Sequence, residues 1–232
     1  MAGGTGQRFG AAKQYEPLDE RRRVIDVSRQ VAERASDGVV VVVPAADAER
    51  EHGVAGGATR SESVRAGLAA VPAEATIICV HDAARPLATD DLYASVIAAI
   101  RAGADGAIPG LAVTDTIKVV DGSDVTATLD RTTLVAVQTP QAFLAAPLLA
   151  AYRQAAADGF VGTDTASCME RYTDLPVRCV PGDAGNVKIT FPDDLFLAER
   201  LLAKAGYDLS GGRERHRRRA HLRDVLPTAR RR

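Results

Sequence analysis

Apolar residues along the chain occur in two kinds of segment. Some form short uninterrupted runs, and others recur at regular intervals within longer stretches. A run without polar interruption, such as the valines at 39–43, predicts a strand that is covered on both faces. In the longer stretches apolar residues recur every three or four positions, which predicts amphipathic helices. In chain order these segments fall at 24–35, 39–43, 64–71, 76–80, 92–100 and 106–109. This order predicts an α/β fold, a three-layer α/β/α Rossmann-like arrangement with a mostly parallel sheet.

Glycines and small polar residues mark where several of these elements begin and end. Gly38 and Gly103 each follow a periodic stretch, and glycine favours a helix end. Ser61 or Ser63 could cap the helix that follows them. Residues 45–55 are small and polar, so we expect a helical turn or a loop there.

Residues of about 113–138 interrupt the α/β pattern. Two strand-like segments, 113–120 and 125–129, flank a turn at 121–124. This pattern predicts an inserted β-hairpin arm. A two-stranded arm is marginally stable alone, so we expect it to dock on a second subunit in a homodimer.

The chain returns to the α/β pattern after the arm. In order we expect a constrained segment at 139–143, helices at about 147–158 and after Thr163 or Asp164, strands at 177–180 and 186–190, and a final helix from about Pro192. These elements complete a domain that we place at residues 1–208.

Composition favours a soluble protein of a reducing compartment. The chain has 232 residues, of which 46% are hydrophobic, so it can bury a substantial core. The three cysteines, Cys79, Cys168 and Cys179, form no metal-binding or disulfide pattern. No apolar run is long enough for a membrane helix, and the N-terminus does not resemble a signal peptide. We therefore expect a soluble cytoplasmic protein.

The net charge of −1 is unevenly distributed. Residues 211–232 contain nine arginines and two acidic residues, whereas the preceding residues carry 20 basic and 28 acidic side chains. The segment 209–232 has few apolar residues and no periodicity, so we expect a basic, disordered tail. It has no aromatic residue on which a base could stack, which speaks against specific nucleic-acid binding.

The first candidate for chemistry is the glycine-rich N-terminus. Gly3, Gly4 and Gly6 cannot belong to a helix interior, but their backbone N–H groups could line a concave site for phosphate oxygens. Arg8 and Lys13 follow and add positive charge. We predict a loop that wraps a nucleoside triphosphate, with an ordinary mobile tail as the alternative.

The second candidate is a set of charged residues at strand ends, where parallel sheets bind ligands. Asp82 follows the strand at 76–80 and offers a carboxylate to Mg²⁺, which prefers oxygen ligands. Lys188 offers a further cation. Together with the glycine loop, these residues favour phosphoryl or nucleotidyl transfer. The alternatives are a turn-forming Asp82, a solvated Lys188 and a structural, hydrogen-bonding His81.

Several segments, in this order, resemble one enzyme family. They are Ala2–Arg8 with Lys13–Tyr15, then His81–Pro86, Asp115–Lys118, Thr139–Gln141 and Asn186–Thr190. The chain resembles the 2-C-methyl-D-erythritol 4-phosphate cytidylyltransferases of the non-mevalonate isoprenoid pathway over about residues 1–205. The resemblance implies transfer of CMP from CTP to that polyol phosphate, with release of pyrophosphate.

The resemblance also implies roles for individual residues. The catalytic residues would be Arg8, Lys13 and Lys188. The nucleotide would be bound by Ala2, Gly3, Gly4, Thr5, Gly6, Gly57, Ala58, Arg60, Ser63, Asp82 and Ala83. The polyol phosphate would be bound by Arg85, Thr116, Arg131 and Thr139, with Arg131 reaching the site of the neighbouring subunit. Asp82 would also help to hold Mg²⁺ or another divalent cation.

The chain departs from the family pattern in three places. The family begins with an apolar strand before the glycine loop, whereas this chain starts inside the loop, so we expect a missing first strand and a natural start upstream. Ala12 stands where the family usually has a proline, which affects the geometry of Lys13. The basic tail is not part of the pattern.

Other functions remain open from the sequence alone. The nearest is a cytidylyltransferase of the same fold that acts on ribitol 5-phosphate. A broader alternative is a sugar-1-phosphate nucleotidylyltransferase. From a different class, the chain could be an inactive nucleotide-binding or scaffold protein.

Overall fold

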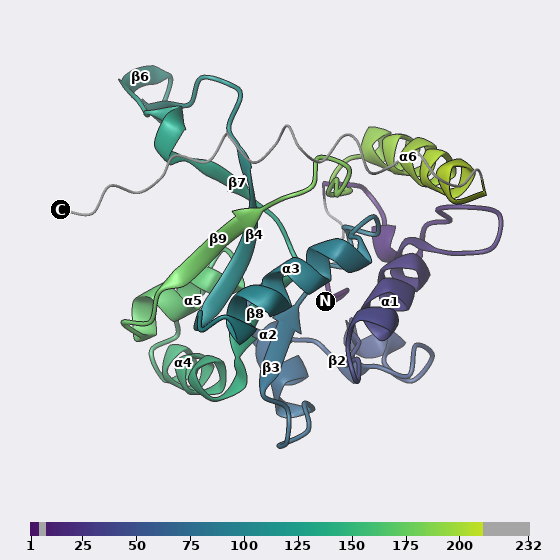
Figure 1. Ribbon diagram of the computed structural model, residues 1–232, viewed down its shortest axis with the longest axis horizontal. Helices are drawn as coiled ribbons and strands as arrows, with labels where there is room; N and C mark the ends of the chain where they lie inside the picture. The colour runs from purple at the N-terminus through teal and green to yellow at the C-terminus, as the bar shows by residue number, and fades with distance from the viewer. Residues whose placement is uncertain (5–7, 211–232) are drawn as a thin grey trace.

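The central sheet carries helices on both faces, as the sequence predicts (Figure 1). The computed structural model describes residues 1–4 and 8–210, with side chains up to residue 204. Thr5, Gly6 and the predicted tail from residue 211 lie outside the described residues. Within the described residues, no helix is both long and apolar enough to cross a membrane.

The largest sheet has five strands, in which β4 pairs with three neighbours. The strands are β3 (Ile77–Val80), β4 (Gly106–Ala112), β7 (Val135–Val137), β8 (Gln141–Leu144) and β9 (Val177–Pro181). Strand β8 lies between β3 and β4 and is antiparallel to both, while β9 is parallel to β4. Strands β3, β4 and β9 therefore run in one direction, and β8 and β7 run against them.

Strand β8 corrects the sequence prediction, which gave its residues only as a constrained segment. Its first residue, Gln141, is fully buried although it is polar. Gln141 therefore hides the apolar pattern by which a covered strand is recognised. Strand β4 is also longer than the predicted 106–109.

The valine run at 39–43 forms a strand only at its end. Strand β1 covers Val42–Val43 and pairs in parallel with β2 (Val54–Ala55) in a separate two-stranded sheet. Among the described residues, the backbone of Met1 and Ala2 links this sheet to the segment after β3. Ala2 N–H donates to the Val42 carbonyl at 2.7 Å, and Ala83 N–H donates to the Met1 carbonyl at 2.9 Å. Earlier in the run no described strand lies alongside, which explains why the strand is shorter than predicted.

Helices cover the two faces of the five-stranded sheet as separate layers. The helices are α1 (Val24–Ala35), α2 (Arg60–Ala69), α3 (Asp90–Arg101), α4 (Ala145–Ala157) and α5 (Thr165–Tyr172). Alternate residues of β3 face opposite layers. Ile78 and Val80 pack into a core with α2, α4 and α5, whereas Ile77 and Cys79 face α3. Helix α1 packs beside α3.

The last helix, α6 (Pro192–Ser210), runs past the predicted domain end at residue 208. Its Ala198 is buried in a cluster with Val24 and Val27 of α1. Ile189, the residue after Lys188, is fully buried in the same cluster. The packing of α6 therefore fixes the segment that carries Lys188.

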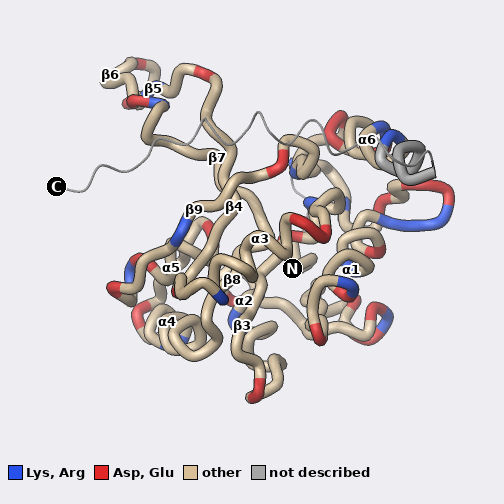
Figure 2. Tube along the Cα trace, in the orientation of Figure 1, with Lys and Arg blue, Asp and Glu red and all other residues tan. Residues whose placement is uncertain are grey.

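The arm projects from the body of the molecule (Figure 1). It contains β5 (Lys118–Asp121) and β6 (Asp124–Thr128), an antiparallel pair that confirms the predicted hairpin, although β5 starts five residues later than predicted. Gly122 has a φ of +58° in the turn, a conformation that glycine adopts without strain. Charged residues of both signs lie along the arm (Figure 2). Val120 and Val125 are 58% and 61% exposed, so this apolar surface is uncovered in a single subunit.

Candidate active site

The N-terminal residues lie between the two sheets and lead into the glycine loop. Ala2 is buried, and the Met1 ammonium donates to the His81 carbonyl at 2.7 Å. Gly3 lies against the second glycine loop, since a Cβ on it would be 3.1 Å from Ser63 Oγ. Gly4 is exposed, and its carbonyl accepts a hydrogen bond from Gln14 Nε2 at 3.3 Å. The described part of the glycine loop is thus held by contacts before and after it, while Gly4 itself is exposed.

Lys13 lies in a short 3₁₀ turn, Lys13–Tyr15, and reaches across to the segment before α6. Its Nζ donates to the Ile189 carbonyl at 2.6 Å. Burial and the nearby charges of Lys188 and Arg8 lower the pKa of Lys13. Arg8 itself is exposed. The three predicted catalytic residues therefore lie close enough for the charges of Arg8 and Lys188 to act on Lys13.

Tyr15 fixes the end of this turn. The Arg50 guanidinium carbon lies 4.7 Å from the centre of the Tyr15 ring, and that of Arg23 lies 5.6 Å away. The Tyr15 hydroxyl donates to Asp47 Oδ2 at 2.9 Å. Cations over a tyrosine face are attracted to it, so these contacts anchor the turn that carries Lys13.

The second glycine loop is organised by the cap of α2, which is Thr59 and not the predicted Ser61 or Ser63. Glu62 N–H donates to Thr59 Oγ1 at 3.1 Å, and the Glu62 carboxylate accepts from the N–H groups of Ala58 and Thr59. This reciprocal arrangement satisfies the first N–H groups of the helix. A Cβ on Gly57 would lie 2.3 Å from Glu62 Cβ, so the turn requires glycine there. Ser63 is buried, and its Oγ accepts from Gly57 N–H at 3.1 Å.

Asp82 is the charged centre of the site. Its two carboxylate oxygens contact Arg60 Nη2 at 3.2 Å and Lys188 Nζ at 2.8 Å. Burial alone would raise the pKa of Asp82, but the Arg60 and Lys188 charges outweigh it and hold that pKa well below its usual range. Asp82 therefore stays ionised between two cations that come from distant parts of the chain.

His81 and Thr139 position the backbone of Asp82. His81 Nε2 lies 3.1 Å from the Arg85 carbonyl, which can only accept, so this nitrogen carries the proton. His81 Nδ1 then accepts from the Thr139 hydroxyl at 3.0 Å, and that hydroxyl accepts from Asp82 N–H at 3.0 Å. Burial lowers the pKa of His81 to about 3, which keeps the ring neutral. His81 thus has the structural role that the sequence left as an alternative. Thr139 must exchange a partner before its hydroxyl can donate to a phosphate.

Arg85 links the end of β7 to the segment that carries Lys188. Its Nη1 donates to the Asn186 carbonyl at 2.8 Å, and its Nη2 donates to the Val137 carbonyl at 3.3 Å. Asn186 is fully buried and donates from Nδ2 to the Thr139 carbonyl at 2.9 Å. The buried Arg85 Nε has no partner among the described residues, so this guanidinium keeps an unused donor.

These residues open onto a cavity of about 420 Å³. Five residues predicted from the sequence line it: Arg60, Asp82, Arg85, Thr139 and Lys188. Further polar residues line it that the sequence did not indicate as site residues: Gln138, Gln141, Thr163, Asp164, Ser167 and Glu170. The cavity lies within the range of small-molecule sites and is strongly charged.

Gln141 and Asp164 give the added side of the cavity its shape. Gln141 Nε2 donates to Asp164 Oδ2 at 2.8 Å, and Gln141 Oε1 accepts from the N–H groups of Thr165 and Ala166 at the start of α5. Asp164 also caps α5 by accepting from Ser167 N–H at 2.9 Å. The sequence indicated Asp164 only as a helix cap. A polar residue inside an apolar strand, as at Gln141, is the signal that could have pointed to this side.

Thr116 and Arg131 do not join the site within one subunit. Both are exposed on the arm, and neither lines the cavity. The Arg131 guanidinium donates to the carbonyl of Thr114, inside the arm. Their predicted contact with substrate stays a prediction.

Asp82 is the carboxylate to which the sequence assigns a divalent cation. Within residues 1–4 and 8–204, no group of three His, Cys, Asp or Glu side chains is placed to hold a metal ion. Mg²⁺ commonly binds one or two carboxylates together with substrate phosphates. Asp82 fits that mode, in which a nucleotide supplies the remaining oxygens.

Comparison with known proteins agrees with this geometry. The sequence model of the IspD family, 2-C-methyl-D-erythritol 4-phosphate cytidylyltransferase, matches residues 1–204. The chain belongs to this family. A family member from Symbiobacterium thermophilum, named for that activity, is 44% identical over 217 residues, which are 87% of this chain and 90% of the relative. One from Geobacter metallireducens is 40% identical over 222 residues, covering 87% and 94% of the two chains.

Solved structures of IspD family members share the fold. The 2-C-methyl-D-erythritol 4-phosphate cytidylyltransferase of Thermus thermophilus superposes with a TM-score of 0.74 at 33% identity, covering 87% of this chain and 96% of that one. The 4-diphosphocytidyl-2C-methyl-D-erythritol synthase of Anaerococcus prevotii gives a TM-score of 0.76 at 27% identity, covering 87% and 93%.

Some relatives are larger fusion proteins. The bifunctional enzyme IspD/IspF of Oleidesulfovibrio alaskensis is 51% identical over 142 residues, which are 61% of this chain. The match spans 36% of that relative, and a similar match spans 56% of the bifunctional enzyme of Nitratidesulfovibrio vulgaris. The chain therefore spans about a third to just over half of the length of these relatives.

Proposed function

We propose that the protein is a cytidylyltransferase that transfers CMP from CTP to 2-C-methyl-D-erythritol 4-phosphate and releases pyrophosphate. The observation that carries this proposal is the position of Asp82 between Arg60, which follows the second glycine loop, and Lys188, with all three lining the charged cavity. Membership of the IspD family and the names of relatives that match most of the chain support it.

In this proposal the glycine loop and its cations bind the triphosphate. Backbone N–H groups of Gly3 and Gly4 are proposed to bind phosphate oxygens, as in other glycine-rich phosphate loops. Lys13, Arg8 and Lys188 direct positive charge to the α-phosphate, where negative charge grows in the transition state. Lys13 already hydrogen-bonds a carbonyl at 2.6 Å and exchanges this partner for a phosphate oxygen.

The chemical step is an in-line displacement at the α-phosphorus. An oxygen of the acceptor phosphate attacks, the new P–O bond forms, and the bond to the β-phosphate oxygen breaks so that pyrophosphate leaves with the electron pair. The attacking phosphate oxygen is already ionised at neutral pH, so no side chain needs to remove a proton. The residues of the site therefore act by orientation and charge.

The second glycine loop is proposed to hold the cytosine and ribose through Gly57, Ala58, Arg60 and Ser63. Ala58 is exposed at the tip of this loop, whereas Ser63 is buried and fixes the turn beneath it. Backbone carbonyl groups of such a loop can distinguish the amino group of cytosine from the carbonyl of uracil.

The acceptor is proposed to occupy the cavity of about 420 Å³, with its phosphate near Arg85, Thr139 and Lys188. Thr116 and Arg131 would come from the arm of a partner subunit, because they lie away from the cavity of their own chain. This part of the proposal includes a homodimer formed through the arm. The exposed valines of the arm support it.

Asp82 is proposed to help position Mg²⁺ or a similar cation together with the nucleotide phosphates. A bound cation would neutralise phosphate charge and align the triphosphate. Asp82 is suited to this because its carboxylate stays ionised. We also propose a cytoplasmic location, since the described chain has three free cysteines and no disulfide.

Pyrophosphate release with CTP, Mg²⁺ and a panel of polyol phosphates tests the function. We expect turnover with 2-C-methyl-D-erythritol 4-phosphate and little with ribitol 5-phosphate. Greater turnover with ribitol 5-phosphate, or turnover only with UTP or dTTP and a sugar 1-phosphate, would replace the proposed substrates. CTP binding without turnover of any acceptor would indicate an inactive nucleotide-binding protein.

A further inference from the structure

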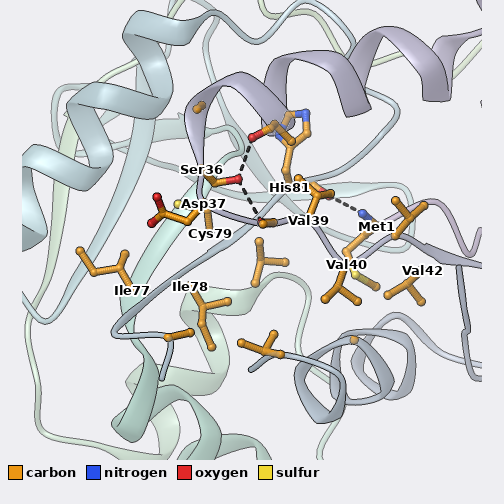
Figure 3. A pocket seen from close by; sticks show the side chains of 18 of the residues that line it. Met1, Ser36, Asp37, Val39, Val40, Val42, Ile77, Ile78, Cys79 and His81 are labelled. Carbon is orange, nitrogen blue, oxygen red and sulfur yellow. Dashed lines mark hydrogen bonds between the residues drawn. The ribbon is translucent and has the colours of Figure 1, made fainter. Parts of the chain in front are cut away.

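Two cavities of the described chain differ in the chemistry of their linings. A larger cavity of about 880 Å³ separates the segment before β1 from β3, and the charged side chains that line it are exposed. Figure 3 shows mainly apolar side chains around it, among them Val40, Val42, Ile77 and Ile78. The charged and polar groups that a polyol phosphate needs converge instead on the cavity of about 420 Å³, which we call the acceptor cavity.

One wall of the acceptor cavity is a face of helix α5. Asp164, the cap of this helix, lines the cavity together with Ser167 and Glu170. These residues recur every three positions, and residues at that spacing are neighbours on a helix surface. The face therefore runs along the cavity from the start of α5 toward its end.

The start of this face lies beside the cations of the site. Arg60 Nη1 donates to Thr165 Oγ1 at 3.4 Å, while Arg60 Nη2 contacts Asp82 Oδ1 at 3.2 Å. Glu170 lies five residues beyond Thr165, which is about 7.5 Å along the helix axis at about 1.5 Å per residue. Among the described residues, no cation lies within ion-pair distance of Glu170. The acceptor cavity thus has cations at one end of the α5 face and a carboxylate at the other.

The carboxylates of the acceptor cavity differ in what they can still bind. Asp164 accepts from Gln141 Nε2 at 2.8 Å and from Ser167 N–H at 2.9 Å, so both of its oxygens have a partner. Asp82 is paired with two cations. Glu170 is exposed and has no hydrogen bond to another described residue. Its oxygens can therefore accept hydrogen bonds from a bound molecule.

A free carboxylate is a poor neighbour for a phosphate but a good one for hydroxyl groups. Two negative charges at close range repel each other, which disfavours a phosphate or a carboxylate next to Glu170. A hydroxyl group can instead donate to the Glu170 carboxylate, and hydrogen bonds to charged groups are stronger than those between neutral groups. The cavity therefore suits a molecule with one anionic end and one neutral end that carries hydroxyl groups.

We propose that Glu170 is a specificity-determining residue of the acceptor cavity, which accepts hydrogen bonds from the hydroxyl groups of the acceptor at the end away from its phosphate. This role rests on the proposed function. Glu170 fixes the direction of the acceptor, because its charge keeps the phosphate near Arg85 and Lys188, where that phosphate must attack. It also rejects acceptors that carry a negative charge at both ends.

Two acceptors that differ only at the far end test this role. 2-C-Methyl-D-erythritol 4-phosphate ends in a hydroxymethyl group, whereas the 4-phosphate of 2-C-methyl-D-erythronate carries a carboxylate at the same carbon. Pyrophosphate release at saturating CTP gives kcat/KM for each, and the ratio of the two values measures specificity. We expect the wild-type protein to prefer the polyol at least about a hundredfold, because the carboxylate would face Glu170.

Substitutions of Glu170 should change this ratio. Glutamine and lysine are good helix formers, so both variants keep α5. Glu170→Gln removes the repelling charge and should lower the preference for the polyol at least about tenfold. Glu170→Lys places a cation there and should lower it further. The KM for CTP should stay the same, because Glu170 contacts the acceptor alone. An unchanged ratio in both variants would overturn the proposal, even if total activity fell, since a structural defect lowers turnover of both acceptors alike.

Glu199→Gln is the matched control. Glu199 is also an exposed glutamate of a helix, α6, but it does not line the acceptor cavity. This variant should keep the wild-type ratio. An equal change of the ratio in Glu199→Gln and Glu170→Gln would trace the effect to the net charge of the protein and overturn the assignment.

A second pair of acceptors separates this proposal from the proposed function. Ribitol 5-phosphate and 5-phosphoribonate differ in the same way at the far end. If the wild-type protein turns over only ribitol 5-phosphate and Glu170→Gln lowers that preference, the proposed substrate is wrong and the role of Glu170 stands. If 2-C-methyl-D-erythritol 4-phosphate is turned over and the ratio never changes, the role of Glu170 alone is wrong. No turnover of any acceptor would contradict both.

Discussion

Lys188 and Asp82 meet across 106 positions of sequence, with 2.8 Å between Lys188 Nζ and Asp82 Oδ2. The Lys188 side chain is 41% exposed, so solvent screens the pair and it adds little to stability. Its position at the mouth of the charged cavity matters more. We expect Lys188 to leave Asp82 for a phosphate when substrate binds, because a phosphate carries more charge than one carboxylate.

Replacing Lys188 with glutamine should therefore impair activity more than stability. We expect turnover to fall at least about a hundredfold, since one cation is removed from the transition state. The unfolding midpoint should change by less than about 2 °C, because the side chain is partly exposed. Pyrophosphate release and thermal unfolding measure the two effects. Lys188→Arg, which keeps the charge, is the matched control, and a tenfold or smaller loss in Lys188→Gln would rule out a catalytic role.

Lys13→Ala and Arg8→Ala test the other two predicted cations. Lys13 is partly buried and bonded to Ile189, whereas Arg8 is exposed. If both act on the α-phosphate, each substitution should lower kcat by orders of magnitude and change the KM for CTP less. A reduction of less than about tenfold in either variant would contradict the role assigned to that residue. Steady-state kinetics at saturating acceptor provide the measurement.

Thr139 offers a test of the hydrogen-bond chain behind Asp82. Thr139→Val keeps the shape of the side chain but leaves His81 Nδ1 and Asp82 N–H without their partner. We expect a loss of about 1–3 kcal/mol in the free energy of unfolding, the usual cost of an unsatisfied buried polar group. Thr139→Ser retains the hydroxyl and should lose much less. If Thr139→Val and Thr139→Ser were equally stable in urea titrations, these hydrogen bonds of Thr139 would not stabilise the fold as described.

The neutral state of His81 makes stability depend on pH. Burial lowers the pKa of His81 from 6.5 to about 3, so the unfolded chain binds a proton below pH 6.5 that the folded chain does not bind. Stability from this group is therefore fully present above pH 6.5. It falls as the pH drops toward 3, by at most about 1.4 kcal/mol per pH unit.

Imidazole NMR signals check this directly. The His81 ring signals of the folded protein should stay constant between pH 8 and 5, whereas those of the urea-unfolded protein should titrate near pH 6.5. In His81→Gln, unfolding free energies should depend less on pH over the same range. Titration of His81 near pH 6.5 in the folded protein would show that the ring is not enclosed as described.

The sequence predicted the parts of this molecule that follow local rules. Helix α1 has apolar residues at regular spacing, and the hairpin arm has a turn glycine between polar residues, so both could be located. Strand β8 could not, because Gln141 is buried by contacts with Asp164 and α5 that lie more than 20 positions away. Strand β1 shows the opposite difference, because it is shorter than the valine run predicts. A valine run forms a full strand only where partner segments lie on both sides.

The residues of the candidate site divide in the same way, into those that local sequence motifs indicate and those that only the folded structure identifies. The segments around Asp82 and Lys188 could be recognised one by one, and the fold then brought them into contact. Nothing local in the sequence distinguishes Glu170 or Gln138, which line the same cavity, from solvent-exposed or structural residues. Such residues are identified by packing, which depends on the whole chain.

Arg131 provides the sharpest test of the dimer proposal. It lies on the arm, outside the cavity of its own subunit, so it should act only in the site of a partner. Arg131→Ala and Lys13→Ala should each give a weakly active dimer, because every site in it lacks one cation. In a mixed dimer, however, one site would combine an intact Lys13 with an intact Arg131 from the other chain.

Subunit mixing therefore gives opposite results for the two arrangements. If Arg131 acts in the partner's site, unfolding and refolding the two variants together at equal concentration should restore about a quarter of the wild-type activity, since half of the dimers then carry one complete site. If Arg131 acts within its own subunit, no mixed dimer contains a complete site, and activity stays at the level of the separate variants. Each variant refolded alone controls for recovery of the fold, and sedimentation confirms that dimers have formed. A mixture that stays inactive while dimers form would exclude a contribution of Arg131 to the neighbouring site.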